Sequence, residues 1–564
     1  MLALGAILLL ALLLRLWGIK YGLPFGYQID EERIYVRGAA RMLDAGSVNP
    51  HYMHNPPLLT YLLEVIFAVR YGGSEAHRLI GEVPGRTDLF LTARIVTALI
   101  GTLAVWLTFA AARRFFDRRV GLVAALLMAV AFLPVFYSHV ALNNVPAMAA
   151  ASAALIGTAG ILRRGATGDY VLAGAFVGIA AATKYLDGIV VVPMLTAILV
   201  APRGPGTPSL RRALALAIGV ALAAFVICNP FALIKPAHFI GSLSVQGDVV
   251  GTHKFGQTAD GGVEHYLRTF TWGLGWVPVI AALGGAALLA RTDRRRALVL
   301  IPIVPLFVLY MGLKTRYFGR WMLPVFPIVC MLAAYGAVRA ADLAAARLRR
   351  PQVAIALTAL AAVALAAQGI VHSVHNDRVL SRPHTLNLAR SWMLDHVPPD
   401  SRVITEPFVA NAWNSPWDHA ITSPRLLLGG DSAYARYLSD RLVRTYLRDG
   451  YCWVVASSNY WGLALSDPII GKRAASYYAA LARYGTVRFS ASPWGDVGRP
   501  GGPGQDVVPF DYDWSYDFYP LSYEHAGPMV QVFQLHGGAC GGGSGAVPPS
   551  RPRLSSNRSP RSAS

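Results

Sequence analysis

Long apolar stretches recur through the first two thirds of this chain, and they constrain its fold more than any other feature. A helix needs about 20 predominantly apolar residues to cross a bilayer. Eleven stretches approach that length: 1–19, 89–112, 120–138, 146–162, 170–186, 188–201, 213–229, 271–290, 297–313, 321–338 and 352–371. The stretch at 188–201 is short and could form one bent span with its neighbour. The pattern predicts a polytopic α-helical membrane protein with about eleven transmembrane helices.

The charges of the chain agree with this interpretation. Only 15% of the residues are charged, whereas soluble domains carry about 25%. A net charge of +20 would suggest nucleic acid in a soluble protein, but most arginines here fall in short loops between apolar stretches. Lys and Arg gather in the cytoplasmic loops of membrane proteins. We therefore expect no nucleic-acid partner, and the Arg-, Gly- and Ala-rich composition indicates a bacterial plasma membrane.

The distribution of arginines also predicts the orientation and the domains. The Arg-rich loops alternate, so the loops between them face outward. Residues 1–371 are expected to form the transmembrane domain, with a long outward loop at about 20–88. Short β-like runs alternate with helical stretches in residues 372–536, which predicts a small extracytoplasmic α/β domain. Residues 537–564 are rich in Gly, Ser, Pro and Arg and are expected to be disordered.

The four cysteines give no further constraint by their spacing. Cys228, Cys330, Cys452 and Cys540 form no C-x-x-C pair and no other metal-ligand pattern. The sequence therefore indicates no disulfide framework.

Adjacent carboxylates follow the first apolar stretch and form the first candidate for chemistry. Asp30 and Glu31 lie at the end of a predicted membrane helix. Carboxylates there cost free energy unless they have a function or stay hydrated. Asp30, with Glu31 beside it, is the catalytic candidate, because partial burial and a like charge suit a general base. The alternative is that Asp30 caps the following helix. The two interpretations are compatible, since a cap also fixes the carboxylate.

Cationic side chains in the outward loops form the second candidate for chemistry. The rule that places Lys and Arg in cytoplasmic loops does not require them there. Arginine holds phosphate through a forked set of donors. The alternative is that these side chains anchor helix ends at the membrane surface. The candidates for phosphate binding are Arg33, Lys184, Arg316 and Arg320.

Further polar side chains are expected to line a substrate cleft between these groups. They are His54, Asn55, His139, Asn144, Tyr185 and Tyr317. A divalent metal held by His54, Glu31 and another histidine stays open. No H-x-x-x-H or H-x-H spacing favours that site.

The order of these motifs resembles the GT-C membrane glycosyltransferases, and most closely their branch of protein O-mannosyltransferases and aminoarabinose transferases. The resemblance covers about residues 10–405 and rests on Asp30-Glu31, His54-Asn55-Pro56-Pro57, Lys184-Tyr185 and the run from Arg316 to Pro327. It implies a polyprenyl-phosphate-linked sugar donor and transfer on the outer face. It also implies that Asp30 activates or orients the acceptor and that Arg33, Lys184 and Arg316 or Arg320 contact the donor phosphate.

Two departures from that family pattern matter. Many relatives carry Asp where this chain has Asn144, and the aminoarabinose branch has an acidic-basic pair where His54-Asn55 stand. These changes argue against aminoarabinose transfer.

The expected function is a hexosyl- or pentosyltransferase that passes a sugar from the lipid carrier to a protein, lipid or cell-wall glycan. The alternative is a polytopic transporter or flippase of lipid-linked sugars, a class in which inverted repeats are common. We find no such repeat in the sequence.

Overall fold

The computed structural model describes residues 2–72, 75–204, 206–251, 261–406, 411–417, 421–422, 438–495 and 521–541. The chain divides into two compact units, the first running to Arg382 and the second beginning at Pro383. The predicted boundary after residue 371 falls inside a helix that continues to Leu380. The two units are described separately below.

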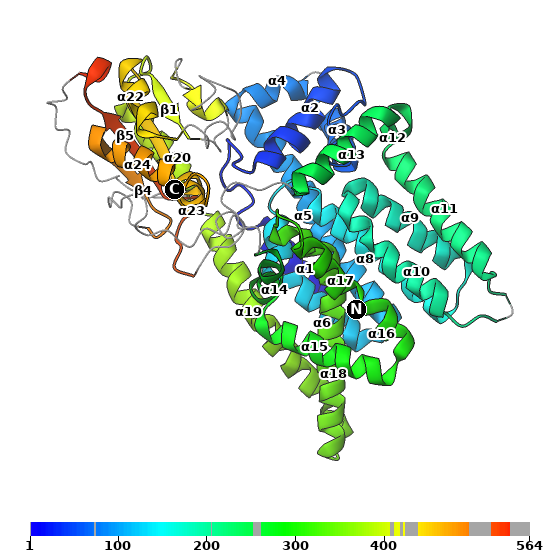
Figure 1. Ribbon diagram of the computed structural model, residues 1–564. Helices are drawn as coiled ribbons and strands as arrows, with labels where there is room; N and C mark the ends of the chain where they lie inside the picture. The colour runs from blue at the N-terminus through cyan, green and yellow to red at the C-terminus, as the bar shows by residue number, and fades with distance from the viewer. Residues whose placement is uncertain are drawn as a thin grey trace, which may run out of the picture. The chain divides into compact units, whose positions relative to one another are not determined.

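The first unit is helical throughout its regular part (Figure 1). Its α-helices are α1 (Leu2–Leu16), α2 (Arg37–Asp44), α3 (Leu58–Tyr71), α4 (Glu75–Gly81), α5 (Val83–Phe115), α6 (Arg118–Val130), α7 (Phe132–Tyr137), α8 (Asn144–Arg163), α9 (Thr167–Thr183), α10 (Val191–Val200), α11 (Leu210–Cys228), α12 (Phe231–Ile234), α13 (Pro236–Gly251), α14 (Gly262–Gly273), α15 (Trp276–Thr292), α16 (Arg294–Leu300), α17 (Ile303–Gly312), α18 (Phe326–Arg347) and α19 (Ala354–Leu380). A π-helix, η1 (Glu31–Val36), and three 3₁₀ segments, η2 (Tyr185–Val190), η3 (Gly319–Val325) and η4 (Pro351–Val353), complete it.

The polytopic helical architecture is confirmed, but the number of eleven spans is not. In the described part, six helices are long and apolar enough to cross a membrane, or seven if the bent pair α14 and α15 counts as one span. The predicted spans 1–19, 170–186 and 188–201 correspond to shorter apolar helices, namely Leu2–Leu16, Thr167–Thr183 and Tyr185–Val200. Breaks within apolar stretches, such as the one between α9 and η2, shorten the continuous helices.

Small residues allow the helices of the first unit to pack closely. A Cβ atom added to Gly174 of α9 would lie 2.3 Å from the carbonyl oxygen of Ala217 on α11. A Cβ atom on Gly157 of α8 would lie 2.4 Å from the backbone nitrogen of Ala173 on α9. Close backbone approach through Gly and Ala is the usual way in which membrane helices associate. The Gly- and Ala-rich composition is therefore used in packing.

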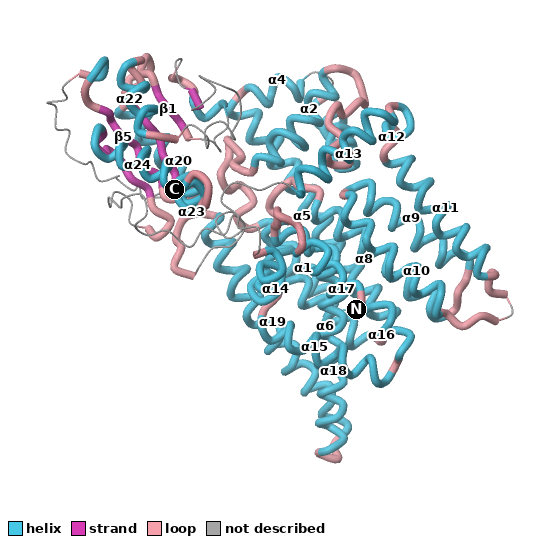
Figure 2. The backbone as a smooth tube through the Cα atoms, viewed as in Figure 1, coloured by secondary structure: helices cyan, strands magenta, loops and turns pink. Residues whose placement is uncertain are grey.

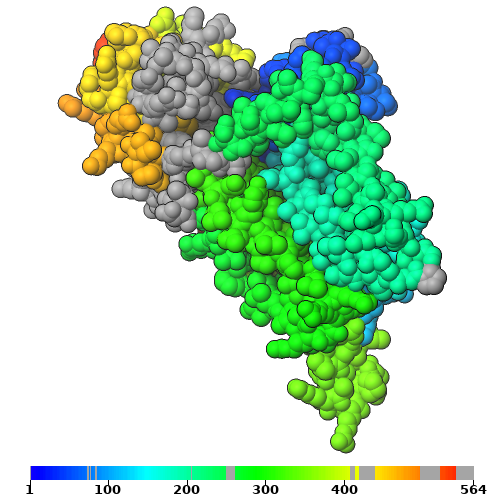
Figure 3. All heavy atoms as spheres, turned by 45° about the vertical axis from the view of Figure 1, so that its right-hand side comes forward, coloured from blue at the N-terminus to red at the C-terminus, as the bar shows by residue number. Residues whose placement is uncertain are grey.

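The two ends of the first unit differ in chemistry. The turn between α18 and α19 is exposed and carries Arg347, Arg349 and Arg350. It projects at the bottom of Figures 1 and 3, at the end of the unit opposite to α2, α3 and α4. The segment that contains α2, α3 and α4 is the predicted outward loop, so the Arg-rich turn and this loop lie at opposite ends of the unit.

The second unit contains all the strands of the described residues (Figure 2). Its sheet has the order β2-β1-β3-β5-β4, with β1 (Val403–Thr405) parallel to β2 (Ile421–Thr422) and β3 (Trp453–Ser457), and β5 (Val530–Leu535) antiparallel to β3 and β4 (Gly485–Ala491). The helices are α20 (Thr385–His396), α22 (Asp440–Arg448), α23 (Ser458–Ser466) and α24 (Gly471–Tyr484), with 3₁₀ turns η5 (Asn411–Asn414) and η6 (Gly538–Cys540). The predicted α/β character is confirmed.

A disulfide closes this unit, contrary to the expectation from the sequence. Cys452, just before β3, is bonded to Cys540 at the end of η6. The residues from Gly537 to Gly541 therefore belong to the second unit and are not part of a disordered tail. The remainder of the predicted tail, 542–564, lies outside the described residues. The pairing could not be predicted from cysteine spacing, because 88 residues separate the two cysteines.

Removing this disulfide is expected to weaken the second unit. The double change Cys452→Ser and Cys540→Ser should lower its free energy of unfolding by about 2–5 kcal/mol, as for other native disulfides that close long loops. Hydrogen exchange of the β3 and β5 amides in the intact chain measures the effect. Cys228→Ser, which changes a free thiol of the first unit, is the control and should leave these amides unchanged. Equal protection in both variants would show that the disulfide contributes nothing to this unit.

Candidate active site

Three irregular helical segments of the first unit meet around one group of charges. The segments are the π-helix η1 and the 3₁₀ helices η2 and η3, and η2 contacts η3 directly. Arg320 on η3 lies with a guanidinium nitrogen 3.6 Å from a carboxylate oxygen of Asp30, which precedes η1. Both charges also act on Lys184, which precedes η2. Irregular helices in membrane proteins are tolerated where they line a site or are buried in protein.

Asp30 is the accessible carboxylate of this cluster. Its side chain is 40% exposed, whereas that of Arg320 is 10% exposed. Asp30 occupies the N-cap position of η1, but its side chain makes no capping hydrogen bond. The capping alternative therefore has no side-chain contact to support it, and the carboxylate stands open beside a cation.

Two tyrosines adjoin the same carboxylate. Burial, and after it the charge of Asp30, raises the pKa of Tyr52 to about 12 and that of Tyr35 well above the usual phenol range. Both hydroxyls therefore stay protonated at any physiological pH. Tyr52 also packs edge-on against His54, with 5.0 Å between ring centroids.

Glu31 lies in a different setting from its neighbour. It is fully buried, and Arg94 of α5 donates two hydrogen bonds of 2.8 Å to its two carboxylate oxygens. The backbone N–H of Ala141 donates a third, also at 2.8 Å. Both oxygens of the Glu31 carboxylate are therefore engaged by neighbouring groups. The structure does not place Glu31 beside Asp30 as a second reacting group.

Two arginines of α5 hold the segment that carries Asp30. Arg94 also donates to the carbonyl oxygens of Ile19 and Tyr21, at 2.9 and 2.8 Å. Arg86 donates to the carbonyl of Pro24 at 2.9 Å and pairs with Glu32 at 3.2 Å. Sequence reasoning missed both arginines. Their signal was a spacing of eight residues, which puts them on one face of a helix whose apolar surroundings make charges costly.

Lys184 is buried where α9 gives way to η2. Its backbone is extended, with φ −154° and ψ 119°, and the carbonyl of Thr183 before it accepts a hydrogen bond of 2.8 Å from the Asn143 amide. The ammonium nitrogen lies 3.8 Å from a carboxylate oxygen of Asp187. Asp187 was not singled out in the sequence because nothing local marks it as the partner of Lys184.

The other predicted phosphate-binding arginines lie in different positions. The guanidinium of Arg320 stacks on Phe318, 4.1 Å from the ring centroid, and the amide of Asn144 donates to the Arg320 carbonyl at 3.4 Å. Arg33 lies on η1 and is exposed. Arg316 is half-buried, and the adjacent Tyr317 packs against His265 with 4.8 Å between ring centroids.

Two further predicted cleft residues connect the outward loop to the helices. A ring nitrogen of His54 lies 3.2 Å from the carbonyl oxygen of Ser242 on α13. The Tyr185 hydroxyl donates to the carbonyl of Met53 at 3.0 Å. Asn55 contacts the hydroxyl of Tyr52. These contacts place the His54-Asn55 segment against η2, next to Lys184.

His139 does not belong to this cluster. It is fully buried, with its two ring nitrogens 2.8 Å from the Trp17 carbonyl and 2.9 Å from the Val135 carbonyl. One of these nitrogens is also 3.5 Å from Asp377. The side chain links the residue just after α1 to α7 and α19, so the structure places His139 in the packing between helices and not with Asp30 and Arg320.

The metal site left open by the sequence would draw on side chains that commonly bind metal ions. Among the described residues, no group of three His, Cys, Asp or Glu side chains is arranged to hold a metal ion. Glu31, one of the predicted ligands, has its oxygens engaged by Arg94 and Ala141.

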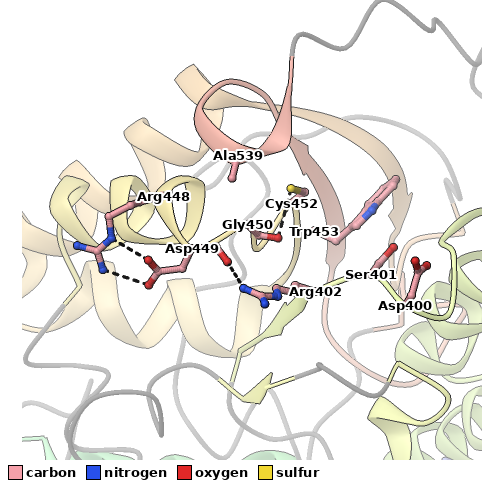
Figure 4. A pocket seen from close by; sticks show the side chains of 9 residues that line it. All are labelled: Asp400, Ser401, Arg402, Arg448, Asp449, Gly450, Cys452, Trp453 and Ala539. Atoms are coloured by element: carbon pink, nitrogen blue, oxygen red, sulfur yellow. Dashed lines mark hydrogen bonds and ion pairs between the residues drawn. The ribbon is translucent and has the colours of Figure 1, made fainter.

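The second unit has a cavity of about 500 Å³ next to the disulfide (Figure 4). Its charged side chains largely engage their neighbours. Arg448 donates two bonds to the Asp449 carboxylate, at 2.7 and 3.1 Å, and Arg402 donates to the Asp449 carbonyl at 2.6 Å. The Arg448–Asp449 pair of this cavity lies at the surface, with side chains 74% and 34% exposed, whereas Arg320 beside Asp30 is mostly buried.

Part of the chain resembles a known protein family in sequence. Residues 54–233 match the family model described as dolichyl-phosphate-mannose-protein mannosyltransferase. A search of curated proteins finds no significant match. The matched segment includes His54, Lys184 and Asp187 and ends before η3.

Solved structures resemble the chain over most of its length. ArnT from Cupriavidus metallidurans bound to undecaprenyl phosphate is 16% identical, with a TM-score of 0.52, and the match covers 82% of this chain and 94% of that one. An Archaeoglobus fulgidus oligosaccharyltransferase tethered to an acceptor peptide is 16% identical, with a TM-score of 0.53 and coverage of 88% and 73%. AglB from the same organism, with an inhibitory peptide and a dolichol-phosphate, is 14% identical, with a TM-score of 0.50 and coverage of 93% and 77%. These likenesses show a shared fold.

Proposed function

We propose that this chain is a member of the GT-C superfamily of membrane glycosyltransferases and that it moves one sugar from a polyprenyl-phosphate-linked donor to an acceptor outside the cytoplasm. The observation that carries the proposal is the pairing of an accessible carboxylate, Asp30, with a mostly buried arginine, Arg320, at 3.6 Å. This pair lies beside a second buried cation, Lys184.

The proposed reaction is a displacement at the anomeric carbon of the donor sugar. The acceptor hydroxyl oxygen forms the new bond to that carbon, and Asp30 takes the hydroxyl proton. The bond between the anomeric carbon and the phosphate oxygen breaks, and the electron pair leaves with the phosphate. Negative charge therefore builds on the phosphate, where Arg320 and Lys184 stabilise it. Attack opposite to the leaving group inverts the configuration.

The structural neighbours support the choice of donor. One was solved with undecaprenyl phosphate and another with a dolichol-phosphate, and a third carries an acceptor peptide. A polyprenyl phosphate is thus a ligand of this fold. The alternative, a transporter or flippase, finds no support in the comparisons. A hexose or a pentose both fit the proposal, and the acceptor is a protein, a lipid or a glycan.

The proposed location is a bacterial plasma membrane with the second unit outside the cytoplasm. Disulfides persist in oxidising compartments and are rare in the cytoplasm. The bond between Cys452 and Cys540 therefore supports an extracytoplasmic second unit. The Arg-rich turn after α18, at the opposite end of the first unit from α2 to α4, supports the same orientation.

Replacing Arg320 by Gln tests the phosphate-binding part of the proposal. The variant should bind undecaprenyl phosphate about 10- to 100-fold more weakly, because it loses charge-assisted hydrogen bonds to the ligand. Binding of labelled undecaprenyl phosphate to the purified full-length protein measures this change. Arg78→Gln is the control, since Arg78 is exposed and pairs with Glu75 and Glu82 on the surface. Equal affinity of the Arg320 variant and the intact protein would contradict the assignment.

A further inference from the structure

One buried carboxylate beside the proposed site takes no part in the steps above. Asp187 is fully buried on η2, three residues after Lys184. The backbone N–H of Asp187 donates a hydrogen bond of 2.9 Å to the carbonyl of Lys184, which closes the turn at the start of η2. The Asp187 carboxylate and the Lys184 ammonium lie 3.8 Å apart.

This ion pair leaves hydrogen-bonding capacity unused. Within the described part of the chain, neither carboxylate oxygen of Asp187 has a hydrogen-bond partner, and the ammonium nitrogen of Lys184 has none either. A separation of 3.8 Å is an ion-pair distance but too long for a hydrogen bond. Buried polar groups are nearly always hydrogen-bonded, so groups left open in this way need an explanation.

The charges around Lys184 indicate the role of its N–H donors. A buried ammonium is costly without a counter-charge, and Asp187 is the nearer acid, since Asp30 acts on Lys184 more weakly. Arg320, from η3, repels the ammonium. The cluster thus holds two carboxylates and two cations, and only the carboxylate of Asp30 is appreciably exposed.

We infer that Asp187 is a positioning residue: its carboxylate is the counter-charge that holds the Lys184 ammonium in place, and it leaves the N–H donors of Lys184 for the phosphate group of the sugar donor. The inference rests on the proposed function and deepens it. The carboxylate acts only through Lys184. The phosphate of the donor or product completes the hydrogen bonding that Asp187 does not supply.

A double-mutant cycle on phosphate binding tests this inference. The cycle compares four full-length proteins: the intact protein, Asp187→Asn, Lys184→Gln and the double variant. The probe is labelled undecaprenyl phosphate without sugar. Asp187→Asn should weaken binding about tenfold in the presence of Lys184 and by less than about twofold in the Lys184→Gln background, because coupled residues are not additive.

Additional variants separate charge from packing. Asp187→Glu keeps the negative charge and should bind within about threefold of the intact protein. A loss as large as that of Asp187→Asn would overturn the inference, and so would equal losses in both backgrounds of the cycle. Asp342→Asn, which alters a partly exposed pair with Arg119 near the far end of α18, is the matched control and should bind normally.

The two proposals fail differently. Sugar transfer by the intact protein with additive effects in the cycle would remove the role of Asp187 and keep the transferase. An intact protein that neither binds undecaprenyl phosphate nor transfers sugar would remove the proposed function itself. A merely structural Asp187 would reduce the amount of folded protein in both backgrounds without coupling to Lys184.

Discussion

Asp30→Asn is expected to lower kcat for sugar transfer by about 10²- to 10⁴-fold, the usual contribution of a general base. The amide cannot take the proton of the acceptor hydroxyl, although its size is nearly that of the carboxylate. Donor binding should change little, because Arg320 and Lys184 remain in place. Folding should also be unaffected, since the Asp30 side chain makes no capping hydrogen bond and is 40% exposed. Kinetics with purified protein at saturating donor measure the effect.

The control for this variant lies in the same outward loop. Asp44 at the end of α2 is exposed, and Asp44→Asn should transfer sugar at the normal rate. If the Asp30 variant reacts as fast as the intact protein, the carboxylate does not act as the base. If both variants are equally slow, the loss arises from the loop and not from the carboxylate.

Arg94→Met is expected to destabilise the first unit by about 3–5 kcal/mol, the effect of breaking a buried ion pair by removing one partner. The change would leave Glu31 buried and unpaired, and the carbonyls of Ile19 and Tyr21 would lose their donor. Arg94→Lys should rescue little, because an ammonium cannot reproduce the two parallel bonds and the carbonyl contacts. The yield of folded protein and its thermal stability in detergent measure the loss.

A surface pair provides the comparison for Arg94. Arg268 and Glu264 are both 66% exposed on α14, and exposed pairs contribute less than about 1 kcal/mol. Arg268→Met should therefore have normal yield and stability. If Arg94→Met is as stable as the intact protein, the segment between α1 and η1 is held by contacts other than the Glu31 pair.

The sequence predicts the fold class well because hydropathy reports directly on burial in lipid. The runs of apolar residues give the helices of the first unit, and short β-branched runs give β1, β3, β4 and β5. The number of spans is harder to predict, because a break such as the one at Lys184 leaves the hydropathy of the stretch unchanged. The break depends on what η2 packs against.

The candidate site shows the same division. Asp30, Lys184 and Arg320 were predicted, since charges at the ends of apolar stretches are conspicuous, and the structure brings these three together. The partners of buried charges were not predicted, because Arg94 is 63 residues from Glu31. His139 is polar and close to a predicted loop, yet it is buried against Trp17. Sequence identifies charged residues, but only the fold shows which of them already have partners.

Transfer of a sugar from a polyprenyl phosphate is best tested by a comparison of donors. Purified full-length protein in vesicles, with a membrane extract as the source of acceptor, would receive the same labelled sugar either on a polyprenyl phosphate or on a nucleotide. We expect that label leaves the lipid-linked donor with the intact protein, that Asp30→Asn nearly abolishes this release, and that the nucleotide sugar is not used. No release from any lipid-linked donor, together with movement of the intact donor across the bilayer, would rule out the transferase and favour a flippase.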